Sequence, residues 1–389
     1  MPAISPFTGL LYDPAVAGSA ASLTAPPYDT VGADDRRTLA RDPHNIVHVD
    51  LPQPRPGDDR DDNEYTRAAS TLSSWRDAGV LRETPTTSTF PYEMSFTADG
   101  RTRRIRGLIA SVDVQPWGAE VTPHEEVAPG PVQDRLELLR AVRTNLSPVY
   151  ALFPGPRRGL ASFLDAAADR EPDVELTDAD GTRHRLWVVP GDAPDVPDDE
   201  VLLIADGHHR YTTALRYREQ MRAAHGPGPW DRIMMLLVDV GSEHPPVLPI
   251  HRVSVVTPPP ALHGEQTGRK QALQGRNDEH PTVAVVTSAD DGPVWSLARL
   301  EGSPPAVRAL HADPGFAAQM DRGDVRFTHD AAEAEEAVRR GDARAAYLLP
   351  PTSAERIAAA VAAKERMPQK STFFWPKPRT GMVLRPLVD

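Results

Sequence analysis

One segment in the middle of the chain, Leu202 to Ala214, constrains the local fold more than any other. Its first four residues, Leu202-Leu203-Ile204-Ala205, are apolar and typical of a buried strand. Asp206-Gly207 follows as a turn signal, and Tyr211 and Ala214 then recur at helical spacing. The sequence therefore predicts a strand, a sharp turn and a helix here, within a chain of the α/β (α+β) class.

The turn of this segment predicts an anion site. The start of a helix presents backbone N–H groups and the positive end of the helix dipole at one point. His208, His209 and Arg210 add ring N–H donors and a planar guanidinium for phosphate oxygens, while Gly207 has no Cβ to keep a phosphate away. The alternative is that Asp206 caps the helix, the histidines are ordinary surface residues and Arg210 pairs with an acidic neighbour. A metal site is weaker, because adjacent helical side chains point ~100° apart.

The composition excludes several classes of protein. The 389 residues include no Cys, which excludes a disulfide scaffold, a thiolate zinc site, an iron–sulfur cluster and a cysteine nucleophile. With 43 basic against 55 acidic side chains, the formal net charge of −12 makes nucleic acid an improbable partner. No apolar run approaches the roughly 18 residues of a membrane span, and the N-terminus lacks a secretion signal. We expect a soluble cytoplasmic protein without a membrane partner, and oligomerisation stays open.

A second motif, Pro123 to Val127, places a histidine and two carboxylates in a loop after a strand. A carboxylate in such a loop can act as general base on a hydroxyl group. Two neighbouring carboxylates can also share a Mg²⁺ ion held by phosphate oxygens. The alternative is that Glu125 and Glu126 are solvated loop residues.

Lysine is rare and lies mostly near the C-terminus. Three of the four lysines fall in the last 26 residues. Two of them belong to the stretch Met367 to Gly381, which is rich in aromatic and hydroxyl side chains, and an ammonium there could bind a phosphate or carboxylate. The alternative is a terminal strand that buries its aromatic side chains and leaves its lysines at the rim. The candidate ligands in this stretch, and in a similar short basic element, are Lys370, Ser371, Lys377, His251 and Arg252.

Hydrophobic periodicity and turn signals predict the remaining elements. The expected helices cover 34–41, 64–77, 134–144 and 211–222, with two more capped by Asp330 with Glu333 and by Thr352 with Glu355. The expected strands cover 45–51, 89–97 and 103–114 (joined by an Asp-Gly turn), 148–153, 186–189, 201–205, 233–240, 283–287, 294–300 and 345–349.

Motifs spread over most of the chain resemble those of a family known as domain of unknown function 1015. The stretch Ala-Asp-Gly-His-His-Arg-Tyr is the most specific of them, and the order of the others agrees. The shared elements are Ala25 to Asp29, Asn45 to Pro52, Glu64 to Leu81, His124-Glu125, Asp134 to Leu136, Ser147 to Val149, Ala205 to Ala214, Pro249 to Arg252, and Lys370 to Gly381.

The central part of that family is in turn similar to the ParB/sulfiredoxin nucleotide-binding fold, which includes the free serine kinases. The likeness rests on His124 to Val127 with the helix and strand that follow, and on Asp206 to Arg210. It implies a ParB/sulfiredoxin-like core, which we place over residues 89–256 after an N-terminal α+β region (1–88). Residues 257–280 carry Pro, Gly, Gln, His and charged residues without periodicity and predict a linker, followed by a C-terminal α+β region (281–389).

The resemblance also implies roles for individual residues. Asp206, Gly207, His208, His209 and Arg210 would grip the phosphates of ATP or ADP, with Mg²⁺ bridging them. Glu125 or Glu126, beside His124, would be the general base. The other polar residues of the shared motifs are candidates for binding substrate or phosphate: Tyr28, Asp29, Arg135, His251, Arg252, Lys370, Ser371 and Lys377.

Two positions depart from the family's pattern. Val127 stands where Thr is usual, and Val132 where Lys is usual. The substrate is therefore less well defined than the nucleotide.

Taken together, these features predict a kinase that transfers phosphoryl from ATP or ADP to a small hydroxyl-bearing metabolite, with free L-serine as the first candidate. The first rival is a ParB-like protein that binds CTP or ATP without phosphorylating a metabolite; the net charge and the absence of a convincing helix-turn-helix weigh against it. A sulfiredoxin-like repair enzyme is disfavoured because the chain has no Cys. A scaffold that has lost activity is the last alternative.

Overall fold

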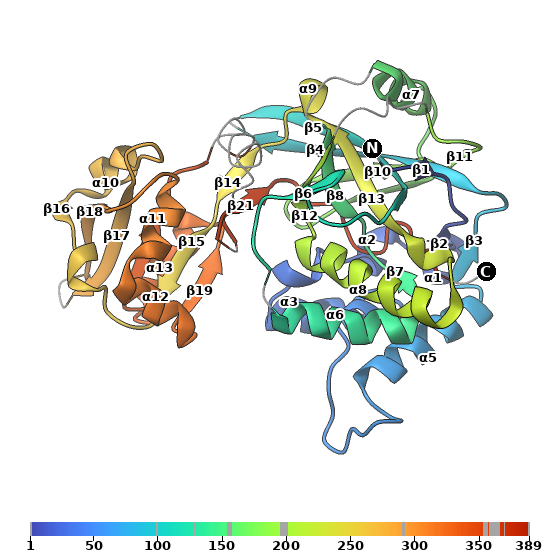
Figure 1. The fold of residues 1–389 in the computed structure, drawn as a ribbon, viewed down its shortest axis with the longest axis horizontal. Coiled ribbons are helices and arrows are strands. Elements are labelled where there is room, and N and C mark those ends of the chain that lie inside the picture. Colours follow the sequence, from blue (N-terminus) through green and yellow to red (C-terminus); the bar gives the residue numbers. More distant parts are fainter. Residues whose placement is uncertain are drawn as a thin grey trace. The chain divides into compact units, whose positions relative to one another are not determined.

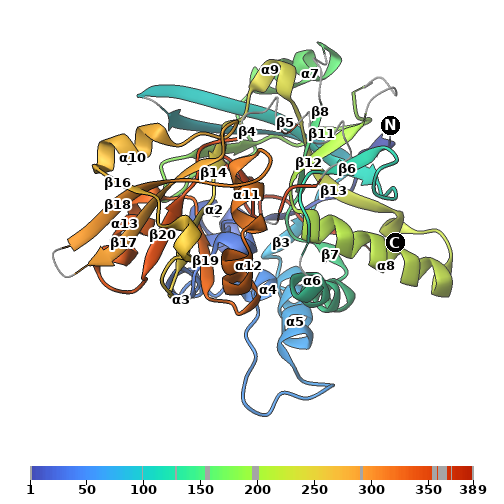
Figure 2. The ribbon, with the colours of Figure 1, turned by 60° about the vertical axis from the view of Figure 1, so that its left-hand side comes forward.

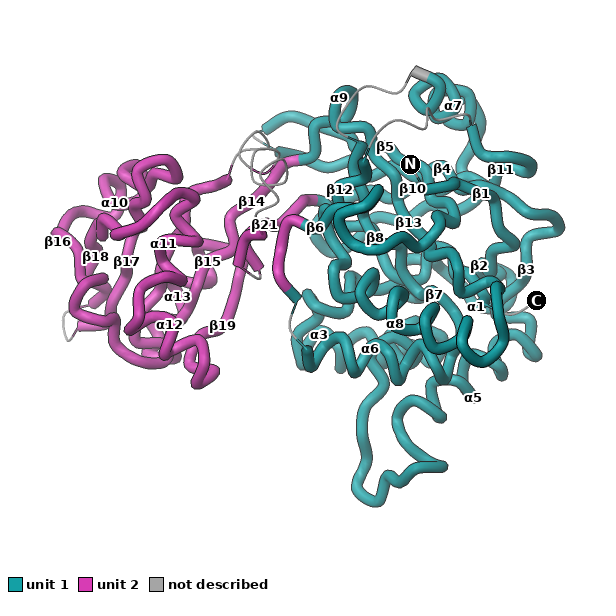
Figure 3. The backbone as a smooth tube through the Cα atoms, in the orientation of Figure 1, with its two compact units in different colours: residues 1–123, 127–245, 376–389 teal, residues 124–126, 246–375 magenta. Residues whose placement is uncertain are grey.

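The structure, a computed structural model, describes residues 2–98, 100–127, 129–153, 158–194, 201–289, 292–352, 357, 366–368 and 370–387. The chain divides into two compact units (Figure 3). Unit 1 consists of residues 1–123, 127–245 and 376–389, and unit 2 of residues 124–126 and 246–375. The chain therefore returns to unit 1 at its C-terminal end, which differs from the expected succession of regions along the sequence.

Unit 1 is built on a mixed sheet (Figure 1) with the strand order β6-β12-β8-β13-β5-β4-β10-β9, in which β1 also pairs with β5 and β11 with β4. β6 is parallel to β12 and β8 is parallel to β13, whereas the other pairs are antiparallel. The strands are β1 (Ile4–Ser5), β4 (Ser88–Ala98), β5 (Arg101–Asp113), β6 (Val121–Pro123), β8 (Val149–Phe153), β9 (Val174–Thr177), β10 (Arg183–Leu186), β11 (Val189–Pro190), β12 (Leu202–Asp206) and β13 (Arg232–Asp239).

The helices of unit 1 lie around this sheet. In Figure 1, α5, α6 and α8 lie together along one side of it. The helices are α1 (Pro14–Ala17), α2 (Ala20–Leu23), α3 (Ala33–Leu39), α4 (Val47–Asp50), α5 (Glu64–Asp77), α6 (Pro129–Val142), α7 (Arg158–Ala168), α8 (His208–His225) and α9 (Val240–Glu243), with short 3₁₀ turns η1 (Tyr28–Thr30) and η2 (Pro229–Asp231). Two further strand pairs join distant parts of the chain: β2 (Leu10–Tyr12) with β3 (Leu81–Glu83), and β7 (Thr144–Asn145) with β22 (Arg385–Pro386).

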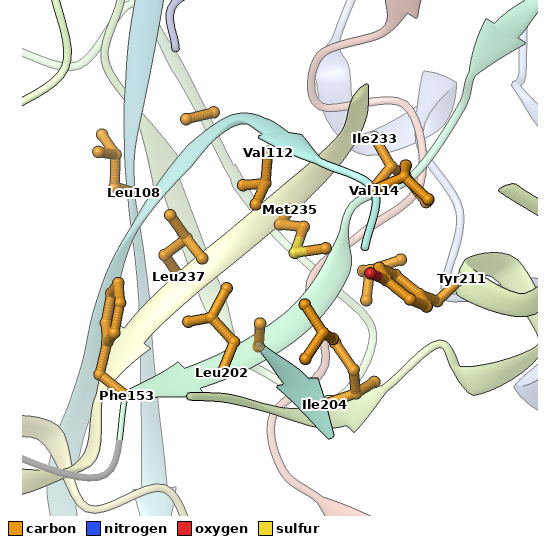
Figure 4. Close-up of a cluster of buried hydrophobic side chains, with 14 of the residues drawn as sticks. Leu108, Val112, Val114, Phe153, Leu202, Ile204, Tyr211, Ile233, Met235 and Leu237 are labelled. Carbon is orange, nitrogen blue, oxygen red and sulfur yellow. The ribbon is translucent and has the colours of Figure 1, made fainter. Parts of the chain in front are cut away.

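The core of unit 1 follows from the apolar strands. Alternate residues of β13, Ile233, Met235 and Leu237, pack in a cluster with side chains of β5, β8 and β12 and with Tyr211 of α8 (Figure 4). The intervening residues Met234 and Leu236 are completely buried as well. A strand covered on both faces reads as a continuous apolar run, as this one does.

Several predicted elements of unit 1 are confirmed. α5 has the predicted bounds, because Asn63 accepts hydrogen bonds from the amides of Tyr65 and Thr66 and so caps the helix. β4 and β5 form the predicted hairpin (Figure 2), with Gly100 at φ 69° in its turn, while Asp99 lies outside the described residues. α6 begins at Pro129, ahead of the expected start, since proline is well tolerated in the first turn of a helix.

One predicted strand is wrong. Residues 45–51, expected to be extended, contain the short helix α4 instead. The Asn45 side chain accepts a hydrogen bond from Val47 N at 2.9 Å and donates to the carbonyl oxygen of Ser22 at 2.6 Å. These bonds turn the chain at the point where alternation of apolar residues suggested a strand.

Unit 2 has an antiparallel sheet in the order β16-β18-β17-β20-β15-β19. Alternate residues of β17 divide between two clusters: Val283 and Val285 pack with α11 and α12, and Ala284 and Val286 with α10 and α13. Helices therefore cover both faces. The elements are β14 (Val247–Pro249), β15 (His251–Ser254), η3 (Pro260–Leu262), β16 (Glu265–Thr267), α10 (Arg269–Gly275), β17 (Thr282–Ala289), β18 (Gly292–Arg299), α11 (Ala306–Ala312), α12 (Pro314–Asp321), β19 (Val325–Thr328), α13 (Ala331–Arg339), β20 (Ala345–Leu348) and β21 (Thr372–Phe374).

The expected linker is part of this unit. Residues 257–280 include β16, which pairs with β18 at the edge of the sheet, and α10, whose Ala272 is completely buried. Edge strands are often short and polar, so the mixed polar composition of this segment did not indicate β16. The helix predicted from Asp330 and Glu333 is confirmed as α13, whereas the one predicted from Thr352 and Glu355 lies largely outside the described residues.

Candidate functional site

The predicted strand–turn–helix is present in unit 1. β12 ends at Asp206, Gly207 adopts a left-handed conformation (φ 91°, ψ 26°), and the 18-residue helix α8 follows. Tyr211 N donates to Gly207 O at 2.9 Å as the first hydrogen bond of the helix. Gly207 has no side chain that could cap the backbone amides of the first helical turn. The helix start thus has the geometry expected of an anion site.

Arg210 is locked against this turn. Its Nη1 donates to Ser147 Oγ at 2.8 Å and to Pro148 O at 2.5 Å, and its Nη2 donates to Asp206 Oδ2 at 2.6 Å. The guanidinium lies so close to Gly207 that a Cβ at that position would be 3.0 Å from Nη2. Gly207 is therefore required both for the backbone conformation and for the position of Arg210.

Lys377 adds a second cation to the turn. Its ammonium donates to Asp206 Oδ1 and lies 3.9 Å from Asp29 Oδ2. Burial alone would lower the pKa of Lys377, but the carboxylates of Asp206 and Asp29 outweigh it and raise that pKa above its usual value. The ammonium therefore stays charged although its side chain is only 9% exposed.

Arg135 and Tyr28 form an adjoining part of the cluster. The guanidinium of Arg135 donates to Asp50 O at 2.6 Å and to Asp134 Oδ2 at 2.8 Å, and its Cζ lies 4.5 Å from the centre of the Tyr28 ring. Burial raises the pKa of the enclosed Asp50 carboxyl, an effect that Arg135 and Arg210 partly oppose. The structure thus brings together the predicted residues Tyr28, Asp29, Arg135, Asp206 to Arg210 and Lys377.

The two histidines of the turn differ in their surroundings. His208 is buried, and its ring stacks on Trp117 with centroids 6.4 Å apart and an interplanar angle of 23°. His209 is half-buried. His208 therefore holds the start of α8 against Trp117, and His209 is the more accessible of the two histidines.

The remaining predicted residues lie in unit 2. The Glu125 carboxylate accepts hydrogen bonds from the backbone amides of three consecutive residues: Lys370 at 3.0 Å, Ser371 at 3.0 Å and Thr372 at 2.8 Å. His124 is completely buried, whereas the side chain of Glu126 is exposed. Lys370 has a left-handed backbone (φ 56°), and Ser371 Oγ donates to Pro368 O at 2.5 Å.

His251 and Arg252 are packing residues in this structure, which differs from the expected phosphate-binding role. Arg252 is completely buried and its guanidinium hydrogen-bonds to Ile250 O and to Nε2 of His311. His251 Nδ1 accepts from Leu349 N at 3.1 Å, which ties β15 to the end of β20.

The charge arrangement offers no ready-made metal cage. Among the residues that the structure describes, no three His, Asp or Glu side chains are grouped to hold an ion. The carboxylates of Asp206 and Asp29 converge on Lys377 instead.

A family model described as a protein of unknown function (DUF1015) matches residues 4–268. The chain belongs to this family. The match covers the motif at His124 and the turn at Asp206 to Arg210, and ends before Lys370 and Lys377. No curated protein matches the chain.

Distant likenesses occur among solved structures. A free serine kinase in complex with AMP is 13% identical with a TM-score of 0.40, and a mutant of a free serine kinase in complex with ADP is 12% identical with a TM-score of 0.41; each comparison covers 68% of this chain and 86% of the other. A conserved hypothetical protein from Pyrococcus furiosus is 12% identical with a TM-score of 0.41, over 69% of this chain and 93% of the other.

In the part of the chain that is described, no helix is long and apolar enough to cross a membrane.

Sequence reasoning missed three partners of the predicted residues. Asp50 lies in the stretch 45–51 that is predicted as a strand, Ser147 is part of a shared motif, and Thr372 follows the candidate Ser371. Asp50 pairs with Arg135, Ser147 with Arg210 and Thr372 with Glu125. The one available signal was that all three polar residues stand next to apolar runs.

The two departures from the family pattern also have positions in the structure. Val132 is completely buried in α6, and its carbonyl oxygen accepts a hydrogen bond from Thr213 of α8 at 3.3 Å. Val127 is half-buried at the point where the chain re-enters unit 1. A lysine at position 132 would have to bury its charge here, so the valine suits the packing of α6 on α8.

Proposed function

We propose that the chain is a nucleotide-dependent kinase that binds ATP or ADP at the turn Asp206 to Arg210 and transfers a phosphoryl group to the hydroxyl of a free amino acid, with L-serine as the first candidate. The observation that carries the proposal is the left-handed Gly207 turn at the start of α8, flanked by two fixed cations, Arg210 and Lys377. Helix dipole, backbone amides and cations all favour phosphate at this point.

Arg210 and Lys377 both bind a carboxylate that a nucleotide phosphate can replace. In the structure Asp206 accepts from both Arg210 and Lys377. A nucleotide phosphate at the turn competes with the Asp206 carboxylate for these two cations, and the turn supplies its backbone dipole in addition. Phosphoryl transfer depends mostly on such positioning and electrostatic stabilisation, which this cluster supplies.

Glu125 is our candidate for the group that orients or deprotonates the substrate hydroxyl. Its carboxylate is held in one orientation by the backbone amides of Lys370, Ser371 and Thr372. Glu126 is the alternative base, and Mg²⁺, carried by the nucleotide phosphates, would offset their charge.

A turnover panel tests the proposal. Purified protein is incubated with Mg-ATP or Mg-ADP and each hydroxy amino acid, and phosphorylated product is measured by mass spectrometry. We expect phosphoserine from the wild type, a large loss in Glu125→Gln with nucleotide binding retained, and near-normal turnover in Glu126→Gln, the variant that tests the alternative base. Absence of product with every hydroxy amino acid would refute the amino-acid kinase, and normal turnover by Glu125→Gln would refute its role as base.

A nucleotide-binding protein without kinase activity is the second candidate. The observation that favours it is the engagement of the Glu125 carboxylate by three backbone amides and the Thr372 hydroxyl. This candidate predicts saturable nucleotide binding, lost in Arg210→Ala, without product from any acceptor in the same panel.

A further inference from the structure

The Thr372 hydroxyl lies within hydrogen-bond distance of both the Glu125 carboxylate and the His124 imidazole. Thr372 Oγ1 donates to Glu125 Oε1 at 2.8 Å, the same oxygen that accepts from the backbone amides of Ser371 and Thr372. On the other side, Nε2 of the completely buried His124 lies 2.7 Å from Thr372 Oγ1. One hydroxyl thus stands between an imidazole and a carboxylate.

The direction of these hydrogen bonds follows from their chemistry. An ionised carboxylate only accepts, so the single hydroxyl proton of Thr372 is used on Glu125. The hydroxyl oxygen must then accept from His124, which means that Nε2 of His124 carries a proton. The chain of donors therefore runs from His124 through Thr372 to Glu125.

The backbone holds both ends of this chain in place. Glu126 N donates to Met367 O at 3.1 Å, and Met367 N donates to His124 O at 2.7 Å, which anchors the His124 to Glu126 segment. Thr372 begins β21, which pairs with β14 opposite Pro249. All of these contacts lie within unit 2. These bonds fix the two segments that carry the side chains of His124, Glu125 and Thr372.

We propose that Thr372 is a positioning residue for Glu125: its hydroxyl is held between His124 and the Glu125 carboxylate, and Nε2 of His124 itself lies 3.5 Å from Glu125 Oε1. The inference rests on the proposed function in one respect, that Glu125 faces the substrate hydroxyl. Each donor that Glu125 accepts restricts the rotation of its carboxylate and favours the ionised form that orients or accepts a hydroxyl proton.

Two substitutions at one position test the hydroxyl separately from the packing. Thr372→Val keeps the branched shape and removes the hydroxyl, while Thr372→Ser keeps the hydroxyl and removes the methyl. We expect Thr372→Val to lower kcat about tenfold or more, the equivalent of one hydrogen bond to a charged group, with KM for the nucleotide unchanged. The kcat of Thr372→Ser should stay within about threefold of the wild-type value, because this variant keeps the hydroxyl. Equal losses in both variants would overturn the inference in favour of packing alone.

A readout independent of activity distinguishes failure of this inference from failure of the kinase proposal. The ¹⁵N chemical shifts of the His124 imidazole in the full chain should report a protonated Nε2, and Thr372→Val should shift the Nε2 signal. In thermal unfolding, the decreases in Tm caused by Thr372→Val and Glu125→Gln should be less than additive. An Nε2 without a proton, or fully additive decreases, overturns the inference even if the protein is a kinase. If the wild type makes no product, these two measurements decide the inference alone.

Discussion

Lys377 donates a hydrogen bond to Asp206 across 171 positions of the sequence. Lys377 belongs to the C-terminal segment that returns to unit 1, and Asp206 ends the strand before the phosphate turn. The segment thus adds a second cation to the turn beside Arg210, which is held by Ser147, Pro148 and Asp206. This relationship makes the C-terminal residues part of the candidate site.

The pair of Lys377 with Asp206 is expected to stabilise unit 1. Lys377→Met leaves Asp206 and Asp29 without their shared cation, and breaking a buried ion pair in this way costs roughly 3–5 kcal/mol. Because Asp206 keeps Arg210 as a partner in Lys377→Met, a double-mutant cycle with Asp206→Asn isolates the contact, and the two losses should be less than additive. Urea unfolding of the single and double variants measures this coupling, with Lys270→Met, an exposed lysine in α10, as the control. Fully additive losses would contradict the pairing.

Arg210 is expected to contribute to nucleotide affinity. Arg210→Ala removes a cation beside the turn, and loss of a hydrogen bond to a charged group costs roughly 1.5–3 kcal/mol, or about 10–150-fold in affinity. Calorimetric titration with ATP and with ADP measures the change. Arg222→Ala is the matched control, because Arg222 lies in the last turn of the same helix and pairs with Asp231. Equal affinity in Arg210→Ala and Arg222→Ala would rule out the turn as the phosphate site.

Gly207→Ala separates backbone strain from contact with Arg210. An alanine at φ 91° is strained, and its Cβ would lie 3.0 Å from the guanidinium of Arg210. Gly226 ends the same helix at φ 79°, and a Cβ there would meet nothing within 4 Å. Both alanine variants should lose about 1 kcal/mol or more of unfolding free energy through backbone strain. Only Gly207→Ala should also weaken nucleotide binding, and equal binding by both variants would show that the turn's contact with Arg210 is unimportant for the ligand.

The sequence predicted the parts of the site that are local. The strand Leu202 to Asp206, the turn at Gly207 and the helix after it were all visible from apolar runs and a turn signal, since each depends on neighbours within a few residues. The contact of Glu125 with Thr372 joins residues 247 positions apart, and no local pattern encodes such a pairing. The burial of His251 and Arg252 is not predictable from the sequence for the same reason, because a basic dipeptide looks alike whether it is buried or exposed.

The helix α4 shows a second kind of limit. Ile46, Val47 and Val49 are completely buried. From Val47 to Leu51 apolar and polar residues alternate, which is typical of a strand. Over four residues the spacing of buried side chains does not separate a helical turn from a strand. The side-chain bonds of Asn45 decide the conformation, and its partner Ser22 lies in a distant segment.

Two histidines of unit 2 are expected to make its stability depend on pH. Burial lowers the pKa of His251 to about 3, helped by Arg276 and Arg252. Burial, together with Arg252, lowers the pKa of His311 to about 3 as well. Each ring accepts a hydrogen bond in its neutral form, His251 from Leu349 N and His311 from Arg252. Protonation would remove the acceptor and place a second positive charge beside an arginine.

The sign of the effect follows from where the protons bind. Between the ordinary histidine pKa of about 6.5 and the folded value of about 3, the unfolded chain binds more protons than the folded one. The stabilisation from these neutral histidines is therefore fully present above pH ~6.5 and is lost as the pH falls toward 3, by up to about 1.4 kcal/mol per pH unit for each ring. Hydrogen exchange in peptides from β15 and β20, measured between pH 7.5 and 4.5 and corrected for intrinsic rates, should show this loss of protection.

His311→Gln identifies one of the two protons. A glutamine can still accept from Arg252 through its side-chain oxygen but does not titrate in this range. The variant should therefore lose protection in β15 less steeply than the wild type as the pH falls. The difference in slope should be at most that of one titrating ring, about 1.4 kcal/mol per pH unit. His225→Gln, at the exposed end of α8 in unit 1, should leave the profile of β15 unchanged. An unchanged slope in His311→Gln would mean that His311 binds the same number of protons in the folded and the unfolded chain, which contradicts the prediction.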